Sequence, residues 1–428
     1  MASSYLAFQV NCCQQKSSIS HHLHVFKTLS SSVKPFLGEL QQLSSRIDVS
    51  KAIKNTSVKF LDAFVDHVFE FIDQPLLPIQ SNFAPVDELR AAVLIKSIEG
   101  EIPDDVPEAD GNKLLHKVDL KLNRCSLWHE IGVTQRYNVF LDYPLSIDIK
   151  RLVLGGPLIK YENEGYAKIG IMPRYGDADS IKWFDVEPNC TFHILNCFED
   201  GDEVVVWGCR ALESIIPGPD LGLDKFEWFS RKFKPIEPVE ESFDAITNDR
   251  LLFSRPYEWR LNMQTGEVKE RNLIGTEFSM DFPMINGDYT GLKNKYGYTQ
   301  IVDSKASSAS GLPKYGGLAK LYFEEPNTEI SMREVQSEEP IKVEYHKFEE
   351  GVFCTGATFV SKGRGLEEDD GWIITFVHNE NTNTSEVYII DTKKFSGEPI
   401  AKITLPCRVP YGFHGAFMST PLHIFEAL

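Results

Sequence analysis

Residues 114–145 read LLHKVDLKLNRCSLWHEIGVTQRYNVFLDYPL. Within this stretch the run Tyr137–Asp142 is short, rich in aromatic and β-branched side chains, and flanked by polar or turn-forming residues. Such runs are typical of strands, and the periodicity of amphipathic helices nearly disappears beyond Asn112. From here onward, the chain is expected to consist of β-strands.

Runs of the same kind recur along the rest of the chain about every ten residues. Examples are Glu203–Trp207, Trp259–Met263, Glu267–Lys269, Trp372–Val377 and Val387–Asp391. Many short, evenly spaced antiparallel strands suit a β-propeller or a sandwich, and a propeller fits 428 residues better. The sequence therefore predicts an all-β fold.

The composition describes a globular, acidic protein. With 42% hydrophobic residues, the chain can bury the core of one large domain or two ordinary ones. A net charge of -18 argues against nucleic acid as a partner. No apolar run approaches the roughly 20 residues that a membrane-spanning helix needs. The eight cysteines form no C-x-x-C pair, and we expect reduced, mostly buried thiols.

Two segments precede the strands. Residues 1–48 are rich in serine and lack acidic residues as far as Gly38, which is typical of an organelle transit peptide or of a disordered tail. The two readings correspond to a chloroplast (plastid) or a cytoplasmic location. Residues 49–80 carry apolar side chains at steps of three and four, which predicts an amphipathic helix. This helix either packs on the core or lies on a membrane surface as a peripheral contact.

An acidic run, Glu367–Asp370, is interpreted as a solvated loop between strands.

Three histidines lie far apart in aromatic, β-prone stretches: His129 in LWHEIG, His193 in CTFHIL and His414 in PYGFHG. A transition-metal ion that must keep coordination positions open for reactants needs neutral nitrogen ligands on a rigid frame. The innermost strands of a propeller face one axis, so residues distant in sequence can meet there.

The residues around these histidines resemble the carotenoid cleavage dioxygenases, most closely the plant enzymes that cleave the 9,10 (9',10') double bond. The matching segments are 114–145, 165–176, 183–188 and 406–415. The resemblance implies that His129, His193 and His414 are three of the family's four iron ligands. It also implies a seven-bladed propeller with Fe(II) on its axis and an apolar tunnel, whose residues it does not identify.

Two family carboxylates that orient ligand imidazoles bear on this sequence. One matches Asp281, where glutamate is commoner, and the other falls at Gly356 and is absent. The shorter side chain of Asp281 puts its hydrogen bond to an imidazole in question.

The resemblance is interrupted between Glu108 and Ala109. The family continues here with a segment that holds its first histidine ligand, which has no counterpart in this chain. Residues 81–428 are therefore expected to form a propeller lacking about two blades, with unpaired strand edges where a closed ring has none.

Two functions from different classes follow. The first is Fe(II)-dependent cleavage of a carotenoid or apocarotenoid by O2 to two carbonyl products. The second is a catalytically inactive truncated chain that binds an apolar ligand or a full-length relative. The oligomeric state does not follow from the sequence.

Overall fold

The computed structural model describes residues 118–120, 124–148, 158–162, 165–212, 254–275, 278–326, 340–363, 365–412 and 414–417, the backbone of 97–100, and the single residues Asn82, Leu122, Arg151, Ser214, Ile215 and Ser230. All of them belong to one compact unit. The expected segments 1–48 and 49–80 and the 108/109 junction lie outside the described residues. Among the described helices, none is long and apolar enough to cross a membrane.

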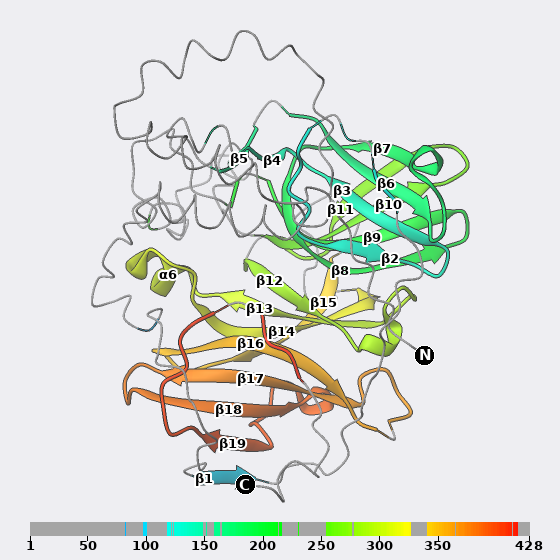
Figure 1. Cartoon of the computed structure of the whole chain (residues 1–428). Coiled ribbons are helices and arrows are strands. Elements are labelled where there is room, and N and C mark those ends of the chain that lie inside the picture. The colour runs from blue at the N-terminus through cyan, green and yellow to red at the C-terminus, as the bar shows by residue number, and fades with distance from the viewer. Residues whose placement is uncertain are drawn as a thin grey trace, which may run out of the picture. The chain divides into compact units, whose positions relative to one another are not determined.

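Two four-stranded antiparallel sheets follow one another along the chain (Figure 1). The first has the order β2-β3-β6-β7 and the second the order β11-β10-β9-β8. Their strands are β2 (Ile131–Val133), β3 (Tyr137–Asp142), β6 (Ala167–Pro173), β7 (Lys182–Val186), β8 (Cys190–Asp200), β9 (Glu203–Ala211), β10 (Arg255–Asn262) and β11 (Val268–Asn272). A separate hairpin of β4 (Leu145–Ile147) and β5 (Ile159–Tyr161) lies between β3 and β6 in the chain.

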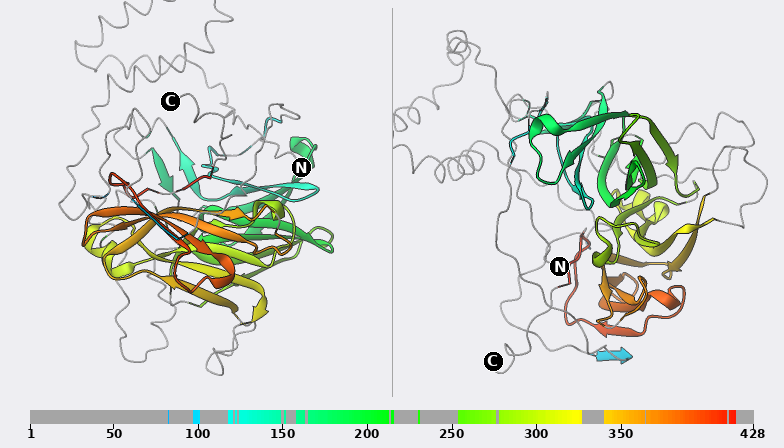
Figure 2. Two further views of the ribbon diagram at one scale, coloured as in Figure 1. Left: turned by 90° about the horizontal axis from the view of Figure 1, so that it is seen from below. Right: turned by 90° about the vertical axis from the view of Figure 1, so that its right-hand side faces the viewer.

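The third sheet has nine strands and consists of two halves (Figures 1 and 2). Its strands are β12 (Met280–Met284), β13 (Tyr296–Val302), β14 (Tyr315–Pro326), β15 (Ile341–Lys347), β16 (Val352–Ser361), β17 (Gly371–Asn379), β18 (Thr384–Asp391), β19 (Ala401–Thr404) and β1 (Ser97–Gly100). One residue pair, Tyr315 with Cys354, joins β14 to β16. The halves β12–β15 and β16–β19 are thus two further four-stranded units, and β1 adds to the edge strand β19.

The described helices are short: α6 (Ser304–Ser310), η3 (Ala178–Ser180), η5 (Gly287–Tyr289) and η6 (Thr392–Lys394). Asp303 caps α6 by accepting a hydrogen bond from the Ala306 N–H at 2.9 Å.

Apolar side chains from consecutive four-stranded units pack against each other. Leu141 and Trp259 belong to a cluster between the first two sheets. The next cluster joins the second sheet to β12–β15, with the rings of Trp207 and Phe323 stacked at 3.8 Å. A third joins the two halves of the nine-stranded sheet. Units that pack face to face in chain order are typical of propeller blades.

These observations confirm the prediction of a mostly β fold. The run Tyr137–Asp142 is strand β3. Thr265 and Gly266, which separate two of the predicted runs, lie in the turn that joins β10 to β11, with Gly266 at φ +82°. No sheet closes on itself among the described residues. The seven-bladed type of the propeller, and the absence of about two of its blades from this chain, stay predictions.

Two details of the sequence analysis are wrong. The loop at Glu367–Asp370 is not solvated throughout, because Glu368 and Asp369 are buried. Glu368 accepts hydrogen bonds from the Lys295 and Tyr296 N–H groups, and Asp369 pairs with Lys320 Nζ at 2.8 Å. The cysteines are free and buried at Cys190, Cys197, Cys209 and Cys354, but Cys125 is disulfide-bonded.

Candidate metal centre

The structure brings the three predicted histidines together from three separate parts of the chain. His129 lies just before β2, His193 lies on β8, and His414 lies in the segment after β19. Strand β8 contacts both β2 and β12, the first strands of their units. Residues 64 or more positions apart therefore meet because the inner strands of consecutive units are neighbours.

The three imidazoles form a compact triangle. Ring centroids are 5.1 Å apart for His129 and His193, 4.9 Å for His193 and His414, and 6.4 Å for His129 and His414. His193 is 4% exposed, whereas His129 and His414 are exposed to solvent. The site thus has one buried imidazole and two that a solvent-borne ion can reach.

This triangle fits a single ion of the first transition row. A metal–nitrogen bond of about 2.0–2.1 Å places the centroid of an imidazole ligand about 3.2 Å from the ion. From the three centroid distances, the point equidistant from the centroids lies about 3.3 Å from each of them, close to the value for a bound ion. Neutral imidazoles are also the nitrogen ligands that suit iron.

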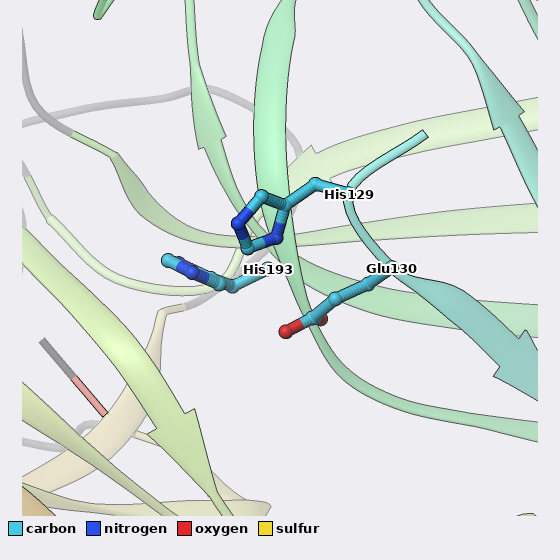
Figure 3. A group of neighbouring side chains, drawn as sticks. All are labelled: His129, Glu130 and His193. Atoms are coloured by element: carbon cyan, nitrogen blue, oxygen red, sulfur yellow. The ribbon is translucent and has the colours of Figure 1, made fainter. Parts of the chain in front are cut away.

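A tighter set of ligand atoms includes a residue that the sequence analysis did not single out. His129, Glu130 and His193 each offer an atom within 4.8 Å of the others (Figure 3). His414 falls outside this set, although its ring is 4.9 Å from that of His193. Rotation about the Cβ–Cγ bond moves ring nitrogens but hardly moves the centroid, so the centroids are the better guide to where the exposed His414 can bind.

Asp281 on β12 reaches His193 despite its short side chain. The His193 Nδ1 lies 2.7 Å from Asp281 Oδ1, which also accepts a hydrogen bond from the Phe282 N–H at 2.8 Å. Because a carboxylate only accepts hydrogen bonds, His193 carries a proton on Nδ1, and in the neutral imidazole the Nε2 lone pair is free. A free Nε2 is what a metal ligand requires.

The electrostatics of this pair are mutual. Burial acts to raise the pKa of Asp281. The charge and hydrogen bond of His193, with hydrogen bonds from Ser254 and the Phe282 N–H, together outweigh burial, so the pKa lies below its ordinary value. Burial likewise acts to lower the pKa of His193, and Asp281 outweighs it, so that pKa is raised. The carboxylate is therefore ionised at neutral pH and holds the imidazole in one orientation.

The other two imidazoles favour their neutral form. His129 is exposed on part of its surface, and its partial burial and the neighbouring His193 lower its pKa. Burial, His193 and His129 lower the pKa of His414. Neutral imidazoles are the metal-binding form, so burial and the neighbouring imidazoles favour the state of these two rings that can bind a cation.

Aromatic rings that the sequence analysis missed line the same place. Phe282 lies 4.7 Å from the His193 ring and 4.9 Å from the His414 ring, and Phe192 stacks on His129 at 5.1 Å. Phe282 has φ +53°, a conformation that non-glycine residues seldom adopt, at a bulge in β12. Its proximity to Asp281 in sequence was a signal, but a positive φ cannot be read from residue type.

Hydrogen bonds position the segment that carries His414, which we call the arm (residues 411, 412, 414 and 415). The Tyr411 hydroxyl donates to Glu380 Oε1 at 3.0 Å, and the Gly412 N–H donates to Thr355 Oγ1 at 2.9 Å. Glu380 also accepts from Lys314 Nζ at 2.8 Å. The arm lies along β16, and its Gly415 passes close to Gly356, which has no side chain to keep it away.

Known proteins share these sequence features. Residues 105–419 match the family model described as "Retinal pigment epithelial membrane protein". The "Carotenoid 9,10(9',10')-cleavage dioxygenase" of Crocus sativus is 32% identical over 424 residues, covering 94% of this chain and 66% of that protein. The "Carotenoid 9,10(9',10')-cleavage dioxygenase 1" of Arabidopsis thaliana is 36% identical over 305 residues, covering 71% and 50%. The chain thus spans less than two thirds of the length of these relatives.

A solved structure shows the same kind of fold. The lignostilbene dioxygenase of Pseudomonas brassicacearum superimposes with a TM-score of 0.56 at 21% identity, covering 71% of this chain and 57% of that one. Since the family model covers well over half of the sequence, this chain belongs to the retinal pigment epithelial membrane protein family, the carotenoid oxygenases, whose members include the carotenoid cleavage dioxygenases.

Proposed function

We propose that this protein is a non-haem Fe(II) dioxygenase that cleaves one polyene double bond of a carotenoid or apocarotenoid. In this reaction the C=C bond breaks and each of its carbons receives one oxygen atom of O2, giving two carbonyl products without an external reductant. The observation that carries the proposal is that the ring centroids of His129, His193 and His414 all lie within 6.4 Å of one another.

In this proposal the three imidazoles hold the ion and Asp281 fixes His193. Bound Fe(II) would supply a centre that binds and activates O2. The Asp281 carboxylate accepts the Nδ1–H of His193, which leaves Nε2 of the neutral imidazole as the nitrogen that could bind the ion. This contact sets the tautomer before the ion arrives, so binding does not have to reorganise the ring.

The aromatic side chains supply the apolar side of the site. Phe282 packs against His193 and His414, and its ring meets that of Tyr315 at 5.5 Å. Burial raises the pKa of Tyr315 well above its ordinary value, so its hydroxyl stays neutral. A neutral aromatic wall is suited to a polyene chain and excludes water from one side of the site.

The finer points extend this proposal. The 9,10 double bond is the expected position of cleavage, supported by the named activity of the relatives from Crocus sativus and Arabidopsis thaliana. A plastid location, with residues 1–48 as a transit peptide, is supported by relatives whose names contain "chloroplastic". Residues 49–80 would form the amphipathic helix. Residues 81–428 would form the oxygenase domain, without the block expected at the 108/109 junction.

The test is the cleavage reaction itself. The full chain is loaded with Fe(II) without air, mixed with a detergent-solubilised apocarotenoid, and exposed to isotopically heavy O2. We expect bleaching of the polyene and two carbonyl products, each with one heavy oxygen atom. The variant H193A should bind no Fe(II) and give no product. The control H346Q should bind Fe(II) and form product like the parent, because His346 lies on β15 and hydrogen-bonds to Phe395 O.

The contrary outcome would be a chain that is folded but leaves the polyene intact at every Fe(II) loading. That result would exclude the dioxygenase and leave the inactive, ligand-binding chain as the remaining reading.

A further inference from the structure

Glu130 directs its carboxylate toward the same place as two of the histidines. It follows His129 directly in the chain, and its ligand atom lies within 4.8 Å of those of His129 and His193. In Figure 3 the Glu130 carboxylate points toward the side of the picture on which the His193 ring lies. Atoms bound to one ion at about 2.1 Å are at most about 4.2 Å apart, so small side-chain shifts would bring all three into contact with it.

The position of the carboxylate is fixed by one oxygen, which leaves the other available. Glu130 Oε2 accepts a hydrogen bond from the Ile194 N–H at 2.5 Å, and Ile194 is the residue after His193. Oε1 accepts no hydrogen bond from the residues that the structure describes. The β8 backbone therefore holds Glu130 beside the imidazole with one oxygen unused.

Iron chemistry gives such an oxygen a purpose. Two histidines and one carboxylate with open positions form the ligand set of many non-haem Fe(II) oxygenases. This chain has no counterpart of the first histidine in the resemblance described above, so three imidazoles alone would leave the ion bound weakly. A carboxylate adds a ligand and also neutralises one of the two positive charges.

We propose that Glu130 is a metal ligand, which binds through Oε1 beside His129 and His193 and takes the place of the imidazole that this chain lacks. This inference rests on the proposed function, because it concerns the same ion. The ligand set then comprises three imidazoles and one carboxylate, drawn from segments before β2, on β8 and after β19.

The test is a titration of the full chain with Co(II) alone, without air, followed by the visible absorption of the bound ion. The variant E130Q replaces the charged oxygen but keeps an oxygen that can accept the Ile194 N–H. The matched control is E270Q, because Glu270 likewise accepts a backbone N–H, from Glu187 at 3.2 Å, but lies on β11.

We expect E130Q to bind Co(II) at least about 100-fold more weakly than the parent, more than is usual for loss of a residue that merely supports a ligand. The absorption spectrum of any bound Co(II) should change as well, which a purely structural role would not cause. E270Q should match the parent in both measurements.

Three results separate the possibilities. If E130Q binds Co(II) with unchanged affinity and spectrum while H193A does not bind, Glu130 is not a ligand and the proposed function stands. If the parent chain binds no Co(II), the proposed function and this inference both fail. If E130Q does not fold, E130D replaces it, and an unchanged affinity and spectrum in E130D would overturn the inference because the shorter side chain draws the oxygen back.

Discussion

Gly415 lies against Gly356 so closely that a Cβ atom on Gly415 would overlap the carbonyl oxygen of Gly356. Gly415 follows His414, and Gly356 lies in the middle of β16. We therefore expect the backbone contact between the two glycines to limit where the His414 backbone can lie. Neither glycine contributes a functional group, yet both should affect the position of the His414 imidazole.

Substituting Gly415 with alanine should move the arm and weaken metal binding. The obstacle is a backbone atom, which cannot rotate away, so the segment itself must shift. We expect Co(II) affinity to fall by about 10–100-fold, as for loss of support to a ligand. The midpoint of urea unfolding should hardly change, since Gly415 lies beyond the last strand, and G275A, with open space around its Cβ position, should change neither.

Restoring the family's carboxylate at position 356 should harm this chain. Gly356 has φ +61°, and a left-handed conformation costs a residue with a Cβ about 1–2 kcal/mol. We therefore expect G356E to lower the free energy of unfolding by at least that amount, measured in urea. G356A should carry most of the same cost, and a G356E chain as stable as the parent would contradict the expected conformation.

Replacing Asp281 with asparagine should weaken the metal site through His193. The amide oxygen can still accept the Nδ1–H, but the negative charge that raises the pKa of His193 is lost. We expect about 10–100-fold weaker Co(II) binding. The exposed carboxylate of Asp185 offers the control D185N, which should bind like the parent. Equal affinity for D281N would show that Asp281 does not support a ligand.

Loss of the Glu380 carboxylate should destabilise the fold. Lys314 is 3% exposed and pairs with Glu380, which also accepts from Tyr411. Removing one partner of a fully buried pair costs about 3–5 kcal/mol, and because Glu380 is partly exposed we expect about 2 kcal/mol for E380Q. The exposed pair of Lys342 and Glu325 gives the control E325Q, for which about 0–1 kcal/mol is expected.

Stability should fall as pH decreases through the range of histidine titration. Burial lowers the pKa of His346 and of His378 in the folded chain below 6.5. The unfolded chain therefore binds protons first, and the stability that these neutral imidazoles contribute is lost progressively as pH falls below that value. His193, with its raised pKa, contributes in the opposite sense.

The measurement is the urea midpoint at about pH 7.5 and about pH 5.5 in the metal-free chain, for the parent and for H378N. The drop between these pH values should be smaller in H378N, which cannot titrate at position 378. An equal drop would mean that folding does not lower the pKa of His378.

Much of the fold could be predicted from local sequence patterns. Runs such as Trp372–Val377 and Val387–Asp391 became parts of β17 and β18, because alternating β-branched and aromatic residues suit a pleated, half-buried surface. The pairing of β1 with β19, about 300 residues away, depends on contacts that no local pattern records. The burial of Glu368 was missed for the same reason, since its partners are N–H groups of residues 295 and 296.

Only part of the candidate metal site could be predicted from the sequence. The motifs around His129, His193 and His414 pointed to the histidines through their resemblance to a family. Glu130 was overlooked because a glutamate next to a predicted ligand looks like an ordinary polar residue until the structure places its carboxylate near His129 and His193. Phe282 was overlooked because its unusual φ arises at a bulge, which is a property of the sheet.

X-ray absorption at the iron edge of the Fe(II)-loaded chain tests the central claim most directly. If three distant imidazoles bind one ion, the spectrum should show nitrogen and oxygen neighbours at about 2.0–2.2 Å together with the outer scattering of about three histidine rings. A spectrum of iron surrounded by water oxygens, without scattering from imidazole rings, would contradict the claim.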